Sequence, residues 1–157
     1  MKLRTMQPQN RIRAFRMSDL DAVLEIERAS FGADAYDRKL FAELFEKCGR
    51  LFLVAASGTC IRAYAVTATA VRREALCAEL VSVAVGPAWR GLGVASALLR
   101  GTLRRLRLRR VHRVTLAVRV SNRKAQALYA KFGFARSRRV RRYYEDGEDA
   151  LVLCKRL

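Results

Sequence analysis

The segment from residue 83 to residue 99 constrains the fold more than any other part of this chain. It joins a short apolar run, a Gly-Pro break, a glycine-rich turn at Gly91 and Gly93, and an amphipathic helical pattern. Glycines have no Cβ, so main-chain N–H groups in such a turn approach a ligand closely. The helix that follows directs its unpaired N–H groups and positive dipole end at the same point. The pattern therefore favours a phosphate or pyrophosphate site, and an ordinary tight turn between strand and helix is the alternative.

Length and composition place this turn in one compact domain. The chain has 157 residues, 52% of them hydrophobic, which is enough to form a proper core. We expect a flexible segment over residues 1–10 and a single domain over residues 11–157. No apolar run approaches the roughly 18 residues of a membrane span, and the first ten residues lack the apolar stretch of a secretion signal. The sequence thus predicts a cytoplasmic protein without membrane contact.

No metal site is expected. The four cysteines are widely separated, without the spacing of a metal or redox pair, and His112 is the only histidine. Free thiols and a histidine in a turn between helix and strand are the simpler interpretation.

The charge of the chain is strongly uneven. The net charge is +18, and residues 86–144 contain seventeen arginines and lysines but no acid. Four acids then follow between residues 145 and 149. A basic block of this kind attracts polyanions such as a nucleotide cofactor, RNA or the ribosome. The alternative is a compositional preference for arginine without a function.

Hydrophobic spacing and turn signals predict a mixed α/β fold. The expected architecture is a central sheet of about six to seven strands with helices on both faces. A helix ending at Gly133 is expected to begin with Ser121 or Asn122 as its cap. The strands are expected over residues 11–15, 51–56, 60–71, 77–85, 114–119, 134–140 and 150–154, and the helices over residues 18–31, 40–45, 95–106 and 122–132.

Three motifs in a fixed order resemble those of the GNAT superfamily of acetyl-CoA-dependent N-acetyltransferases. The first is Arg90-x-x-Gly93-x-Ala95, which is similar to the phosphate loop of that family. The second is Asn122-x-x-Ala125-x-x-Leu128-Tyr129, followed by Phe132-Gly133-Phe134. The third covers residues 143–150 and resembles the C-terminal signature of protein N-terminal acetyltransferases. It is closest to the ribosomal-protein alanine N-acetyltransferases, the RimI-like group.

The resemblance implies acetyl-CoA as co-substrate. The apolar strand would offer main-chain groups to the pantetheine arm, the glycine loop would hold the pyrophosphate, and the asparagine of the second motif would contact the pantetheine. The residues implied in cofactor binding are Val83, Ala84, Val85, Arg90, Gly91, Leu92, Gly93, Val94, Ala95, Ser96 and Asn122.

The catalytic residues implied by the resemblance are Tyr129 and Glu79. Tyr129 would donate a hydrogen bond to the departing sulfur, and core packing beside Leu128 is its alternative role. The RimI-like enzymes usually carry a glutamate base where this chain has Ala117. Glu79 lies at a position that many family members fill with glutamate. Its alternation with Val81 suggests part burial and a raised pKa, which suits a base; an edge carboxylate paired with an arginine is the alternative.

The acceptor implied is the N-terminal α-amine of a protein, with a ribosomal protein as the expected target. An α-amine with a pKa near ~7.8 is about one-tenth neutral at pH 7, whereas lysine is neutral below about one part in a thousand. Without the usual base, the α-amine is the easier substrate. Tyr143 and Tyr144 are expected at the peptide entrance, with a rim of acids at Glu145, Asp146, Glu148, Asp149, Asp34, Asp37 and Glu43, although the acids at 145–149 could simply solvate a turn.

Two other functions remain open. One is a GNAT enzyme that acetylates a small amine, such as a polyamine or an antibiotic. The other is a basic protein that binds RNA or the ribosome without catalysis, supported by Ala117 and by the arginine runs at residues 104–110 and 138–142. The sequence does not distinguish a monomer from a dimer.

Overall fold

The computed structural model describes residues 9–157, so the expected flexible segment lies almost wholly outside the described residues. The chain forms two compact units. The first contains Met1–Val66 and Ser82–Thr102, and the second contains Thr67–Val81 and Leu103–Leu157. Two long strands and one helix run through both units. The expectation of one domain over residues 11–157 stays a prediction.

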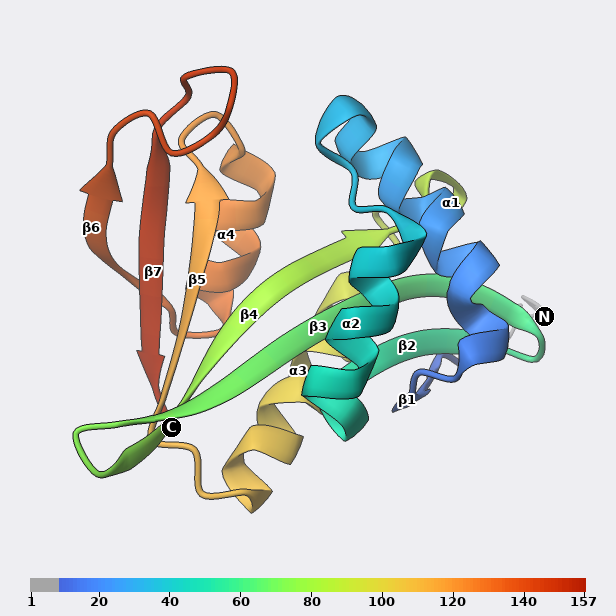
Figure 1. The fold of residues 1–157 in the computed structure, drawn as a ribbon, viewed down its shortest axis with the longest axis horizontal. Coiled ribbons are helices and arrows are strands. Elements are labelled where there is room, and N and C mark those ends of the chain that lie inside the picture. The colour runs from blue at the N-terminus through green and yellow to red at the C-terminus, as the bar shows by residue number, and fades with distance from the viewer. Residues whose placement is uncertain (1–8) are drawn as a thin grey trace, which may run out of the picture. The chain divides into compact units, whose positions relative to one another are not determined.

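Seven strands form one mixed sheet, as the sequence predicted (Figure 1). Their order is β1-β2-β3-β4-β5-β7-β6. The β4–β5 pair is parallel, whereas β1–β2, β2–β3, β5–β7 and β6–β7 are antiparallel. The bounds are β1 Arg11–Ala14, β2 Phe52–Ser57, β3 Cys60–Arg72, β4 Ala75–Val85, β5 Arg113–Arg119, β6 Ala135–Val140 and β7 Ala150–Arg156.

The structure contains four α-helices: α1 Leu20–Phe31, α2 Arg38–Cys48, α3 Val94–Leu108 and α4 Arg123–Lys131. Two of them begin with side-chain caps that satisfy otherwise unpaired N–H groups. Asp37 accepts a hydrogen bond from the main-chain N of Leu40 at 2.9 Å, and Asn122 accepts one from that of Ala125 at 3.1 Å. Asn122 is therefore the cap of α4. No helix in residues 9–157 is long and apolar enough to cross a membrane.

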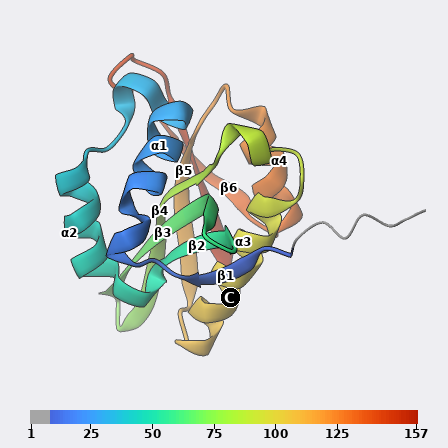
Figure 2. The same ribbon diagram turned by 90° about the vertical axis from the view of Figure 1, so that its right-hand side faces the viewer.

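Aromatic rings fill the core of the first unit. Phe41 from α2 packs edge-on against Tyr64 from β3, with ring centroids 5.5 Å apart. Phe15 stacks on Phe52 of β2 at 4.0 Å. Within this unit, α1 and α2 cover one side of the strands, and the start of α3 lies on the other side (Figure 2). Helices thus cover both faces of this part of the sheet, as predicted.

The second unit is built on the β5–β7–β6 ladder, with α4 following β5 in the chain (Figure 1). Strand β6 is an edge strand of the sheet and carries exposed side chains at all positions except its last residue. Its register with β7 shifts between Arg136 and Arg138, which is a β-bulge. The parallel pairing of β4 with β5 joins Cys77–Glu79 to Arg113–Thr115, so Val83–Val85 lie beyond the part of β4 that pairs with β5.

Candidate active site

The glycine turn has the geometry of an open cradle. Gly91 and Gly93 have φ values of 74° and 78°, in the left-handed region that side chains with a Cβ rarely adopt. A Cβ at either position would meet no atom within 4 Å, so the turn faces open space. Helix α3 begins at Val94 directly after it, and its first turn contains no acid. A helix N-terminus next to exposed main-chain groups suits a phosphate, so the residues present fit the pyrophosphate of acetyl-CoA.

Two hydrogen bonds from the Arg90 side chain hold the glycine turn in place. Its Nε donates to the main-chain O of Val85 at 3.0 Å, and its Nη2 donates to Oγ of Ser30 on α1 at 3.2 Å. These bonds tie the loop to strand β4 and to α1. The binding of cofactor by Arg90 and by Leu92, Val94, Ala95 and Ser96 stays a prediction.

A second support of the turn was not expected from the sequence. The guanidinium of Arg62, a buried side chain on β3, lies 4.1 Å from the ring centroid of Trp89. The main-chain N of Gly86 donates to the main-chain O of Arg62 at 2.7 Å. A Cβ on Gly86 would lie 3.2 Å from the Trp89 ring and 3.3 Å from that carbonyl, so glycine is needed for this close approach. Together these contacts fix the short 3-10 helix Pro87–Trp89 that leads into the cradle.

The remaining predicted catalytic and substrate residues belong to the second unit. Asn122, as the cap of α4, uses its amide oxygen within the fold. Tyr129 is buried, with 9% of its surface exposed, and its ring packs against Phe134 at 5.6 Å. Burial, followed by the influence of Tyr144, raises the pKa of Tyr129 to about 12. The Tyr129 hydroxyl is therefore protonated at neutral pH.

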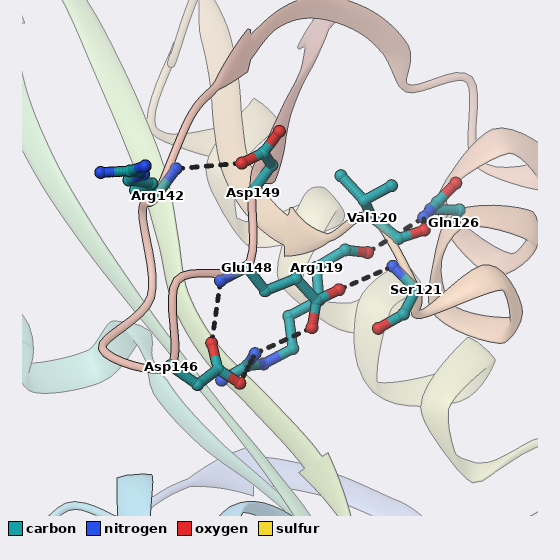
Figure 3. A network of polar contacts seen from close by, with 8 residues as sticks. All are labelled: Arg119, Val120, Ser121, Gln126, Arg142, Asp146, Glu148 and Asp149. Atoms are coloured by element: carbon teal, nitrogen blue, oxygen red, sulfur yellow. Dashed lines mark hydrogen bonds and ion pairs between the residues drawn. The ribbon is translucent and has the colours of Figure 1, made fainter.

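A polar network shapes the loop between β6 and β7 (Figure 3). Arg119, at the end of β5, donates to Asp146 at 2.8 Å and to Glu148 at 2.9 Å. Glu148 also accepts from the main-chain N of Ser121 at 2.9 Å. Bonds from Ser121 and then from Arg119 lower the pKa of Glu148. The loop is thereby fixed to the junction between β5 and α4, which Gln126 braces by donating to the main-chain O of Arg119 and Val120.

The two neighbouring tyrosines of this loop differ in exposure. Tyr143 is 51% exposed, whereas Tyr144 is half-buried and lies over the guanidinium of Arg119, 4.0 Å from ring centroid to Cζ. Their rings contact edge-on at 5.0 Å. The network brings Tyr144 near enough to Tyr129 to affect its pKa. The acids Asp146, Glu148 and Asp149 form ion pairs with arginines, so their roles include holding this loop.

The structure corrects the expected part burial of Glu79. Its side chain is exposed, because Ala78 and Leu80 occupy the buried face of β4 and Glu79 points to the opposite side. The predicted role of Glu79 as base therefore receives no support from burial and stays a prediction.

An open groove of about 380 Å³ lies on the first unit, along the first turns of α2 and the segment that leads into them. Asp37 and Glu43, two of the acids expected at a peptide entrance, line it, and Asp34 does not. The other lining residues are Ala35, Tyr36, Lys39 and Leu40.

Residues 9–157 contain no cluster of three side chains able to hold a metal ion. They do contain a buried carboxylate, Glu27 on α1, that sequence reasoning missed. Its signal was visible in the sequence, because Glu27 falls where the helical spacing from Leu20, Val23 and Leu24 calls for an apolar residue.

Residues 20–134 match the family described as the acetyltransferase (GNAT) family. The chain belongs to the GNAT family. It is 32% identical over 147 residues to the ribosomal protein bS18-alanine N-acetyltransferase of Escherichia coli (strain K12), covering 92% of this chain and 95% of that protein. It is 31% identical over 156 residues to an N-alpha-acetyltransferase of Sulfurisphaera tokodaii, covering 91% and 90%.

Among solved structures, Ard1 from Thermoplasma volcanium has the same fold as this GNAT chain. The TM-score is 0.88 at 26% identity, with 95% of this chain and 98% of that chain covered. The predictions of a GNAT fold, an N-acetyltransferase enzyme and acetyl-CoA as co-substrate are confirmed.

Proposed function

We propose that this GNAT enzyme transfers the acetyl group of acetyl-CoA to the N-terminal α-amine of a protein. The observation that carries the proposal is the open turn at Gly91 and Gly93 before α3, whose geometry suits a pyrophosphate. Val83–Val85, at the end of β4, precede this turn in the chain. The similarity to two N-terminal acetyltransferases along nine-tenths of the chain supports an α-amine as acceptor. A ribosomal protein is the proposed target within that class.

Acetyl-CoA supplies an activated acyl group whose leaving atom is sulfur. In the proposed mechanism, main-chain groups of Gly91–Ser96 hold the pyrophosphate, and the Val83–Val85 segment and Asn122 hold the pantetheine arm. The amine nitrogen forms a bond to the thioester carbon, and the carbon–sulfur bond breaks. Tyr129 donates a hydrogen bond to the departing thiolate. The amine gives its proton to a base, and Glu79, acting through water, is the candidate that the family resemblance implies.

Tyr129 acts in this proposal as a hydrogen-bond donor rather than a full acid. A thiol has a pKa near ~8.5, and the pKa of Tyr129 is about 12, so complete proton transfer would cost about 5 kcal/mol. A hydrogen bond from the neutral hydroxyl stabilises the thiolate without that cost.

The groove lined by Asp37 and Glu43 and the loop bearing Tyr143 and Tyr144 are the proposed peptide-binding elements. Acidic side chains attract an ammonium group, and exposed tyrosines offer apolar surface with a hydroxyl.

Mass spectrometry of peptides incubated with the enzyme and acetyl-CoA tests the proposal. One peptide has a free N-terminus and no lysine, and its matched partner has a blocked N-terminus and one internal lysine. We expect an acetyl mass shift on the first peptide alone. Acetylation of the lysine, or of a polyamine in place of both peptides, would refute the assignment of the α-amine. Calorimetric titration with acetyl-CoA separately measures the cofactor site.

A further inference from the structure

The carboxylate of Glu27 is sealed inside the first unit, with 1% of the residue exposed. Its Oε1 accepts a hydrogen bond from the main-chain N of Tyr36 at 2.9 Å, and its Oε2 accepts one from the hydroxyl of Tyr64. Tyr64 is itself fully buried in β3. A buried carboxylate is costly, and this one is held by these two hydrogen bonds and lies outside the glycine cradle.

The same hydroxyl continues the chain of contacts to β4. Oη of Tyr64 lies 3.0 Å from Oγ of Ser82, and either atom can donate the hydrogen bond. Ser82 is half-buried and directly precedes Val83–Val85, the segment proposed to hold the pantetheine arm. Glu27, Tyr64 and Ser82 therefore form an unbroken line from a buried carboxylate to the strand that leads to the cofactor.

This line is satisfied in two protonation states. With Glu27 ionised, Tyr64 donates to Glu27, and Ser82 donates to Tyr64. With Glu27 protonated, Glu27 donates to Tyr64, and Tyr64 donates to Ser82. Between the two states, Glu27 gains one proton and the hydrogen bonds of Tyr64 and Ser82 reverse direction, which is the property that a chain of proton transfers requires.

The surroundings of Glu27 suit a proton acceptor near neutral pH. Burial raises the pKa of Glu27 to about 7, opposed by the bond from the main chain of Tyr36. The titratable side chains at its contacts are Tyr64 and Tyr36, and the charged neighbours on α1, Glu25 and Arg28, are exposed. Phe41 of α2 covers Tyr64 with an apolar ring.

We propose that Glu27, Tyr64 and Ser82 form a proton wire that receives the proton of the acceptor amine during acetyl transfer. The inference rests on the proposed function. The amine proton passes to Oγ of Ser82, the hydroxyl proton of Ser82 passes to Oη of Tyr64, and the hydroxyl proton of Tyr64 passes to Oε2 of Glu27. One proton enters and Glu27 is neutralised, so charge and atoms balance. Glu27 receives the proton at the end of the wire without touching the substrate, so it is a positioning residue.

The wire supplies a proton acceptor in a chain that lacks the usual glutamate base of the RimI-like enzymes. Ala117 has no proton-accepting group, and Glu79 is exposed. A purely structural role for the same three residues would be to fasten α1 to β3 and β4. The two roles differ in what they do to proton transfer, so the test must measure proton transfer as well as stability.

The pH profile of kcat with saturating peptide and acetyl-CoA is measured for the parent and for Glu27→Gln, Tyr64→Phe and Ser82→Ala. Glu25→Gln, on the exposed side of the same helix, is the matched control. The rate of the parent and of Tyr64→Phe is also measured in mixtures of H₂O and D₂O. Melting curves and the acetyl-CoA affinity report the integrity of each variant.

We expect the parent to lose activity as the pH falls through about 7, and we expect Glu27→Gln to lose this limb, with kcat at least tenfold lower at pH 7.5. Tyr64→Phe and Ser82→Ala should interrupt the wire and lower kcat by a similar factor. The rate of the parent should depend on the D₂O fraction along a curve, and this dependence should become linear in Tyr64→Phe. Glu25→Gln should match the parent.

Two results would overturn the wire. In the first, Ser82→Ala and Tyr64→Phe change the melting temperature but keep the parent pH profile and isotope dependence. In the second, Glu79→Gln alone abolishes the acidic limb. A parent that binds acetyl-CoA but acetylates no amine refutes the proposed function and the wire together, which distinguishes that failure from the first two.

Discussion

In the proposed mechanism, the Tyr129 hydroxyl donates a hydrogen bond to the departing thiolate. Removing this hydroxyl tests that role. Tyr129→Phe keeps the ring that packs on Phe134 and removes only the donor to the thiolate. We expect kcat to fall by roughly 10²-fold, because a positioned proton donor contributes about that much, while the acetyl-CoA dissociation constant stays within twofold. Steady-state kinetics and calorimetry measure the two quantities. An unchanged kcat would assign Tyr129 to core packing alone.

Glu27 also predicts a pH dependence of folding. Its pKa is about 7 in the fold against an ordinary value of 4.5, so the folded state holds the proton more tightly than the unfolded state. The stabilisation from this group is complete below about pH 4.5 and is lost as the pH rises towards 7, by at most about 3 kcal/mol. Denaturant titrations between pH 4.5 and 8 measure it. Glu27→Gln should remove this part of the pH dependence, whereas Glu25→Gln should leave it in place.

The proposed phosphate site at the turn of Gly91 and Gly93 can be tested by placing a side chain on each glycine. Gly91→Ala and Gly93→Ala place a Cβ at a positive φ, which costs about 1 kcal/mol, and put a methyl group into the open cradle. We expect acetyl-CoA binding at least tenfold weaker by calorimetry. Gly58→Ala, in the β2–β3 turn, has a φ of 58° and equally open surroundings, so it imposes the same strain away from the cradle. Equal affinities in all three variants would contradict a phosphate site at this turn.

The guanidinium of Arg119 holds two acids of the loop between β6 and β7. Arg119→Met removes the bonds to Asp146 and Glu148 and the cation beneath Tyr144. We expect the KM for peptide to rise about tenfold, as for loss of a charge-assisted network of 1–2 kcal/mol, with little change in acetyl-CoA affinity. Arg123→Met, an exposed arginine at the start of α4, is the control. A peptide KM equal to that of the parent would exclude this loop from the peptide site.

At the scale of the whole molecule, the net charge of +18 makes contact with RNA a testable expectation. Fluorescence anisotropy with a single-stranded RNA should show log K falling linearly with log salt, by about 0.7 for each phosphate contacted. Replacing the exposed Arg136 and Arg138 of β6 with glutamine should flatten this slope by about one and leave peptide acetylation unchanged. Weak binding without salt dependence would mean that the arginine content reflects composition only.

The architecture and the glycine cradle were predictable from the sequence because local rules determine them. The apolar alternation of β5, the cap at Asn122 and the stop at Gly133 each act within a few residues. The strand and helix order followed from these signals, and the family motifs located the cradle. The turn at Gly91 and Gly93 could be predicted directly, since glycine adopts a positive φ more easily than other residues.

The surroundings of individual side chains were harder to predict from the sequence, because they depend on partners distant in the sequence. Glu79 alternates with apolar residues along β4, and its side chain is exposed. Alternation assigns the side chains of a strand to two faces, but it does not say which face is buried. Glu27 meets Tyr64, 37 positions away, only after α1 docks on the strands, and Tyr64 in turn contacts Ser82, 18 positions further on. The bond between Arg90 and Ser30 spans 60 positions and could not be inferred from the phosphate motif.

The bulged, arginine-bearing strand β6 has a consequence for how this chain behaves at high concentration. An outermost strand exposes a row of unpaired N–H and C=O groups that can recruit the same strand of another copy. The register shift at Arg136 and Arg138 breaks the regularity of that row, and the like charges of two such strands repel. The strand thus acts as a gatekeeper against lateral growth into fibrils.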